Sequence, residues 1–261
     1  MSISIAPAAP PTEEDVRAAN RRVYNSKNFD QYNENKSIFN AAQARRLLGI
    51  LTQLRARTGG TRFLDIGCGT GNLLRLAREV FPEVVGLDQA EKLLAEVRVR
   101  EGLRALTSGQ AHRLPFADQS IDAAGMYALL HHIVDPAPVV AEAYRVLKPG
   151  GMLYTDHDPN YYFGRFYRFW YRLKHRRRHG FGSLDDDMAE YHNVYTSGID
   201  PEQLRRVLRT VGFREVEVRY RHSLNESFCG ARRVALGVLK GLTHVLPCAS
   251  FYSHFYILAT K

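Results

Sequence analysis

Two clusters of glycine and carboxylate residues suggest a binding site for a nucleotide-like ligand. Residues 63–72 place Asp65 just ahead of three alternating glycines. These glycines are Gly67, Gly69 and Gly71. Glycine permits a tight turn and close approach of a ligand to the backbone, and a helix that starts there offers N–H groups to an anion. Asp88 ends the next apolar run, where an acidic side chain in dinucleotide sites accepts hydrogen bonds from ribose hydroxyls.

The glycine spacing differs from the fingerprint of dinucleotide sites. Asn72 stands where the third glycine of Gly-x-Gly-x-x-Gly would be. A loop with the observed spacing suits a carboxylate better than a pyrophosphate, while Asp65 can face an ammonium group. An amino acid carries both groups, so the pattern favours an amino-acid-bearing nucleoside over the alternative of a plain strand-to-helix turn.

The surrounding apolar patterns predict strands and helices in alternation. The expected strands are 62–66, 84–87, 103–107, 121–127, 151–155, 213–220 and 251–259. The expected helices are 37–55, 72–81, 91–99, 138–147, 201–211 and 232–245, with one more from Glu13 capped by Thr12. Alternation of this kind predicts an α/β fold with a parallel sheet and right-handed crossovers. The glycine loop then lies at the carboxyl end of the first strand.

Four segments resemble the class I S-adenosylmethionine (SAM)-dependent methyltransferases, in the branch that holds many small-molecule, quinone-precursor and lipid-precursor methylases. They are residues 64–71, 85–88, 109–116 and 145–151, in the order and at the separations of the family. The resemblance implies a Rossmann-like, doubly wound sheet of seven strands with the last strand antiparallel. It also implies SAM as cofactor and S-adenosylhomocysteine as its product.

The resemblance assigns a set of residues to the cofactor. They are Asp65, Gly67, Gly69, Gly71, Asp88, Gln89, Gln110, Ala111 and Met126. Asp65 and Gly67 would border the methionine part, and Asp88 would hold the ribose. Gln110 stands where the family usually has an acidic residue for the adenine amino group, and its side-chain carbonyl can still accept that hydrogen bond.

Catalysis by such a protein needs an acceptor aligned behind an activated methyl group, and a base where the acceptor must lose a proton. The candidate catalytic residues are Tyr127, His131 and His157. His157 is the preferred base, because Asp156 and Asp158 beside it would raise its pKa towards neutrality. His131 is the second candidate, with a structural role as its alternative. No metal site is expected, because the ligand spacing of known sites is missing.

Most of the excess positive charge lies in one segment. The net charge is +9, and residues 159–182 carry seven of the basic residues and no acidic one. Without those seven, 29 basic residues face 27 acidic ones. Aromatic residues interleave with them over residues 161–179, which leaves three interpretations: a lid over the acceptor, a helix resting on anionic lipid that presents a lipid-linked acceptor, or nucleic-acid binding. The last is disfavoured because no RNA-binding module accompanies the segment.

The organisation expected from these patterns is one domain behind a short leader. The leader is 1–12 and the domain 13–261, divided into cover helices (13–60), cofactor core (61–155), aromatic and basic insert (156–200) and C-terminal helices and strands (201–261). Three widely spaced cysteines favour the cytoplasm, with peripheral membrane contact through 161–179 left open.

The function expected is methyl transfer from SAM to O, N or C of a small-molecule or lipid-like acceptor. Two alternatives stay open: a SAM-binding protein that has lost catalysis, and an NAD-dependent oxidoreductase. The sequence identifies neither the acceptor nor the oligomeric state.

Overall fold

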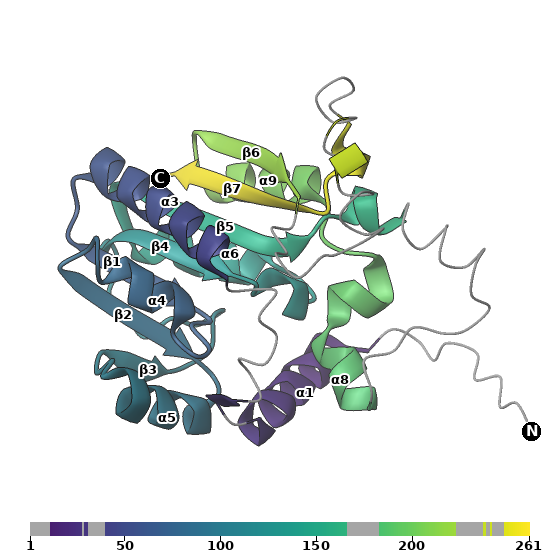
Figure 1. Ribbon diagram of the computed structural model, residues 1–261, viewed down its shortest axis with the longest axis horizontal. Coiled ribbons are helices and arrows are strands. Elements are labelled where there is room, and N and C mark those ends of the chain that lie inside the picture. The colour runs from purple at the N-terminus through teal and green to yellow at the C-terminus, as the bar shows by residue number, and fades with distance from the viewer. Residues whose placement is uncertain are drawn as a thin grey trace, which may run out of the picture.

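One sheet runs through the part of the chain that the computed structural model describes, which is residues 11–27, 29–30, 40–165, 183–222, 237–238, 241 and 248–261. Within these residues the strands are β1 (Arg62–Ile66), β2 (Glu83–Asp88), β3 (Leu106–Ser108), β4 (Ile121–Tyr127), β5 (Leu147–Pro159), β6 (Val216–Arg221) and β7 (His254–Thr260). Their order in this seven-stranded sheet is β3-β2-β1-β4-β5-β7-β6 (Figure 1). Strand β7 pairs antiparallel with both β5 and β6, and the other pairs are parallel. The predicted doubly wound sheet with an antiparallel last strand is confirmed.

Local sequence signals lie at the ends of several described helices. Within the described residues the α-helices include α1 (Glu13–Ser26), α3 (Ala41–Thr58), α4 (Asn72–Ala77), α5 (Glu91–Glu101), α6 (Ala137–Val146), α8 (Leu184–Ala189) and α9 (Pro201–Val211). Thr12 and Asp15 form a reciprocal capping box at the start of α1. Asp200 caps α9 and Gly212 ends it, and the bounds of α9 match the predicted helix 201–211.

Successive side chains along a strand pack alternately into two hydrophobic cores, one on each face of the sheet. Phe63 packs in a cluster with α3 and α4, whereas its neighbour Leu64 packs in a cluster with α6 and α9. This follows from the two-residue period of a strand. Both side chains are fully buried, so β1 is held at the centre of the fold and its carboxyl end is fixed in place.

Two helices from distant parts of the chain lie together beyond the carboxyl ends of the parallel strands. Helices α1 and α8 pack side by side there (Figure 1). Arg22 of α1 forms a bidentate contact with Asp185 of α8, at 2.7 and 2.8 Å. The pair covers the edge at which ligands bind in open α/β sheets.

Several element boundaries differ from the prediction. Helix α4 ends at Ala77, four residues early, and the chain turns before Phe81. Strand β5 begins at Leu147, four residues before the predicted strand 151–155. The Pro149-Gly150-Gly151 stretch belongs to the strand, with Gly150 at a positive φ of 78°. Residues 1–10 of the leader, residues 166–182 of the aromatic and basic insert and nearly all of the predicted 232–245 helix lie outside the described residues. None of the described helices is long and apolar enough to cross a bilayer.

Candidate functional site

The loop between β1 and α4 adopts the conformation that its glycines predict. Gly67, Gly69 and Gly71 have φ values of 75°, 49° and 75°, in the left-handed region that favours glycine. The amides of Gly67 and Cys68 both donate to the carbonyl of Leu87, at 2.7 and 2.9 Å. These bonds tie the loop to the end of β2 and bring the two predicted halves of the site together.

Asp88 organises that junction. Its carboxylate accepts from the amide of Gly69 at 2.9 Å and from the amide of Ala90 at 2.9 Å. Burial raises the pKa of Asp88, and the backbone hydrogen bonds from Ala90, Gly69 and Gln89 oppose the rise. The side chain is therefore fixed in orientation while it lines a pocket.

Asp65 is a buried acid that lacks a partner. Its side chain is 1% exposed, and neither carboxylate oxygen has a hydrogen-bond partner among the described residues. Burial and then the nearby charge of Asp88 raise the pKa of Asp65 to about 8. An unpaired buried carboxylate is unfavourable. A cationic ligand group would relieve it, which fits the predicted ammonium of an amino acid.

A pocket with about 890 Å³ of space, partly open to solvent, lies beside these groups. Five residues assigned to the cofactor line it, namely Gly67, Asp88, Gln89, Gln110 and Ala111. Of the other four, Gly69 holds Asp88, Gly71 starts α4, and Asp65 and Met126 are buried and do not line it. The structure thus gathers the assigned residues around one pocket, with some of them behind its wall.

Helix α1 forms one wall of the pocket. The sequence predicts cover helices, but none of their residues is among those assigned to the site. The pocket-lining residues of α1 are Glu13, Val16, Arg17, Asn20 and Tyr24. Asn20 is 4% exposed and donates to the carbonyls of Val16 and His132, at 2.9 and 3.0 Å. In the sequence, the polar Asn20 on the apolar face of this helix was the feature that could have indicated the pocket wall.

The surroundings of His157, the preferred base, differ from those predicted, and its pKa is shifted in the opposite direction. Its Nδ1 lies 3.0 Å from Arg221 and 3.2 Å from the hydroxyl of Tyr127. The ring stacks between those of Tyr127 and His254, with centroids 5.1 and 4.8 Å away. Burial and the charge of Arg221 outweigh Asp156 and lower the pKa of His157 to about 3, so the prediction of a raised pKa is wrong.

Asp156, one of the carboxylates expected to raise the pKa of His157, is paired with two arginines. Asp156 is fully buried and accepts hydrogen bonds from Arg46 on α3, Arg221 on β6 and the hydroxyl of Tyr154. Burial alone would raise the pKa of Asp156, but Arg221 and Arg46 lower it to about 2. Two cations around one anion leave positive charge next to His157. Burial, and then the charge of the same carboxylate, raise the pKa of Tyr127.

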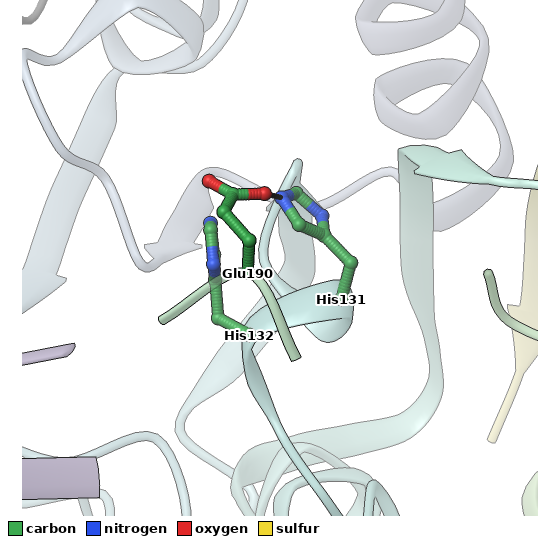
Figure 2. Close-up of side chains that lie close together, drawn as sticks. All are labelled: His131, His132 and Glu190. Atoms are coloured by element: carbon green, nitrogen blue, oxygen red, sulfur yellow. Dashed lines mark ion pairs between the residues drawn. The ribbon is translucent and has the colours of Figure 1, made fainter. Parts of the chain in front are cut away.

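The second candidate, His131, belongs to a separate cluster. Its Nδ1 lies 2.8 Å from Asp158 Oδ1, and its Nε2 lies 3.7 Å from Glu190 Oε2 (Figure 2). Burial lowers the pKa of His131, but the hydrogen bond with Asp158 and the charge of Glu190 outweigh it, and the pKa rises. His132 lies beside it, at 3.8 Å between ring centroids. Nothing in the sequence near the histidines indicated Glu190, which follows α8.

A family model described as "Methyltransferase domain" matches residues 64–155. A demethylmenaquinone methyltransferase of Lactobacillus johnsonii is 31% identical over 189 residues, which cover 68% of this chain and 75% of that protein. The corresponding enzyme of Geobacillus kaustophilus is 34% identical, over 61% of this chain and 74% of its own length.

Other similar proteins match over a shorter part of their length. An uncharacterized 37.1 kDa protein in a transposon of Streptomyces fradiae is 44% identical over 110 residues, which are 40% of this chain and 32% of that protein. The chain matches 43% of the length of a probable SAM-dependent methyltransferase of Mycolicibacterium smegmatis, at 34% identity over 42% of this chain.

Solved structures share the fold. A SAM-dependent methyltransferase from Thermotoga maritima aligns over 93% of this chain and 99% of its own, with a TM-score of 0.55 and 21% identity. A phosphoethanolamine N-methyltransferase of Haemonchus contortus, in complex with SAM, aligns over 83% of this chain and 52% of its own, with a TM-score of 0.53 and 23% identity.

Proposed function

Because the chain belongs to the class I SAM-dependent methyltransferase family, we propose that it methylates a small, hydroxylated aromatic acceptor of the quinol type. The names of the demethylmenaquinone methyltransferases support this acceptor class. The broader expectation of O, N or C methylation of a small-molecule or lipid-like acceptor includes it.

The cofactor end of the proposal depends on the two buried carboxylates. Asp88 would accept hydrogen bonds from the ribose hydroxyls, while Asp65 would meet the ammonium group of the methionine part. Gln89, Gln110 and Ala111 would surround the adenine. When bound, SAM supplies a methyl group carried on a positively charged sulfur. The observation that carries the proposal is the unpaired, buried carboxylate of Asp65 behind a pocket lined by Asp88.

The acceptor would lie on the side of the pocket formed by α1 and the segment after β4. Tyr24 and His132 line that side, together with the apolar Leu129 and Ile133. Aromatic and aliphatic walls with a few polar groups suit a flat aromatic ring. His157 is a poor base for such an acceptor, because burial and the charge of Arg221 lower its pKa to about 3. The rings of Tyr127 and His254 also stack against its imidazole.

Contact with an anionic membrane through residues 161–179 stays a prediction based on composition. Only residues 161–165 of the aromatic and basic stretch are among those described, and Arg165 there lies over the ring of Tyr161 at 5.6 Å. A quinol with an isoprenoid tail would be drawn from a bilayer, and an interfacial helix would bring the enzyme to it. Flotation with anionic vesicles tests this, and equal flotation of wild type and an Arg165→Ala/Arg168→Ala/Arg172→Ala variant would contradict it.

Calorimetry and a transfer assay test the proposed function. Wild-type protein should bind S-adenosylhomocysteine at one site per chain and should not bind NADH. It should then transfer labelled methyl groups from SAM to a panel of reduced quinones. Binding of NADH alone would identify an oxidoreductase. Binding of S-adenosylhomocysteine without transfer to any quinol, phenol or amine tested would identify a protein that binds SAM without catalysis.

A further inference from the structure

We propose that His131, His132 and Glu190 form a binding site for one divalent transition-metal ion at the edge of the pocket. The proposal deepens the acceptor side of the proposed function and rests on it only for the role of the ion. Metal binding itself is a property of these three residues and can be measured without any methyl acceptor.

Three side chains from two separate segments converge at this point. Each offers one ligand atom, and these atoms lie within 4.8 Å of one another, with the carboxylate of Glu190 beside the two imidazole rings (Figure 2). His131 Nε2 and Glu190 Oε2 are 3.7 Å apart. Ligands around a tetrahedral zinc ion lie about 3.3 Å apart, given bonds of about 2.0–2.1 Å. Small side-chain rotations would therefore close the set around an ion.

Hydrogen bonds on the far side of both imidazoles direct their lone pairs to the cluster. His131 Nδ1 lies 2.8 Å from a carboxylate oxygen of Asp158, and His132 Nδ1 lies 2.6 Å from the carbonyl oxygen of Ala189. A carbonyl and an ionised carboxylate only accept, so each Nδ1 carries the proton. In the neutral rings both Nε2 atoms then have a lone pair available for a metal. Metal-binding histidines characteristically show this second contact with a carboxylate or backbone carbonyl.

Glu190, the third proposed ligand, is also oriented by hydrogen bonds. Asn193 donates to Glu190 Oε2 at 2.7 Å. The hydroxyl of Tyr24 lies 3.2 Å from His132 Nε2 and 3.5 Å from Glu190 Oε1. An ion bound to His132 would take the place of that tyrosine contact. The site is therefore oriented in advance, with the hydroxyl of Tyr24 at the position beside His132 Nε2 that an ion would take.

The donor set indicates the class of ion. Two imidazole nitrogens and one carboxylate oxygen suit zinc or another late first-row metal better than magnesium or calcium. Three protein ligands leave a coordination position open, as in catalytic rather than structural zinc sites. Since Tyr24 and His132 line the pocket, a phenolic oxygen of the acceptor would have access to that position. The competing description is a metal-free ion pair between His131 and Glu190.

Titration of the full-length protein with metal tests the proposal. After dialysis against a chelator, wild type should bind one Co²⁺ per chain, with visible absorption bands of a four- or five-coordinate ion that Zn²⁺ removes. Glu190→Gln and His132→Asn should each lose this stoichiometric binding. Asp158→Asn, which removes only the orienting carboxylate, should weaken the affinity about 10–100-fold. Glu202→Gln, on an exposed part of α9, is the matched control and should bind like wild type.

Two further measurements keep the outcome decisive. Calorimetry with S-adenosylhomocysteine on every variant separates loss of the fold from loss of the metal, and Glu190→Asp provides a second, milder change if Glu190→Gln does not fold. No stoichiometric Co²⁺ or Zn²⁺ binding by wild type would overturn the proposal, and so would binding unchanged in Glu190→Gln and His132→Asn. Failure of wild type to bind S-adenosylhomocysteine would contradict the proposed function while leaving the metal titration interpretable.

Discussion

Asp158 binds His131 twice: its Oδ1 accepts from the His131 backbone amide at 3.0 Å and lies 2.8 Å from the ring Nδ1. One carboxylate at the end of β5 thereby fixes both the backbone and the imidazole of the segment after β4. Asp158 is 1% exposed, so water does not compete for this contact. The pair sets which nitrogen of His131 faces Glu190.

Replacing Asp158 with Asn should slow methyl transfer without weakening cofactor binding. The amide keeps the size of the side chain but removes the charge that orients the His131 ring. Loss of such an orienting partner typically costs about 10–100-fold in activity. Steady-state rates with a quinol acceptor measure the effect, and calorimetry with S-adenosylhomocysteine should show affinity within about twofold of wild type. Glu202→Gln, on an exposed part of α9, is the control. Equal rates for Asp158→Asn and wild type would contradict this role.

A second prediction concerns the ribose. Asp88→Asn should weaken binding of S-adenosylhomocysteine by at least about tenfold, because a hydrogen bond to a charged group contributes about 1.5–3 kcal/mol. The amide oxygen can still accept from Gly69 or Ala90, so the fold should persist. Calorimetry measures the affinity and circular dichroism checks the fold. Asp118→Asn, an exposed partner of Arg145, should bind normally. Wild-type affinity in Asp88→Asn would show that the ribose is held elsewhere.

The cofactor half of the site was predictable because its determinants are local. Gly67 directly follows β1 and Asp88 is the last residue of β2, and parallel strands bring their carboxyl ends to one edge. The state of His157 was not predictable in this way. Arg221 and Arg46, which neutralise Asp156, lie 65 and 110 residues from it in the sequence. A rule that considers only neighbouring residues sees two acids beside His157 and predicts a shift of the wrong sign.

The cluster of His131, His132 and Glu190 also depends on contacts between residues far apart in the sequence. His131 and His132 are visible in the sequence, but Glu190 and Tyr24 reach them from α8 and α1, which pack together over the sheet edge. The spacing of ligands on a single element therefore indicated no metal site. Tertiary packing alone brings the carboxylate to the imidazoles.

The third prediction tests the buried network around Asp156. Arg221→Gln should destabilise the protein by about 3–5 kcal/mol, the usual cost of removing one partner from a buried ion pair. The pKa of Asp156 is lowered to about 2, below its unfolded value, so the charged form stabilises the fold above about pH 4 and this contribution is lost as the pH falls towards 2. Urea denaturation at pH 7 measures the loss, and it should shrink near pH 3. Arg219→Gln, an exposed neighbour on β6, should change stability little.

The fourth prediction follows from the pKa of Asp65, which is raised to about 8. Without ligand, the folded protein binds a proton at Asp65 that the unfolded chain releases near pH 4, so this residue lowers stability progressively as the pH rises from about 4 to 8. Asp65→Asn removes that penalty, and the variant should melt higher than wild type at pH 8.5 and close to it at pH 5. The ammonium group of the ligand needs the charged carboxylate. Wild-type affinity for S-adenosylhomocysteine should therefore rise between pH 6 and 8, while the affinity of Asp65→Asn should be weak and nearly independent of pH over that range. Calorimetry across this interval measures both, with Asp118→Asn as the control, and a variant that binds as tightly as wild type at pH 8 would show that Asp65 does not face the ammonium group.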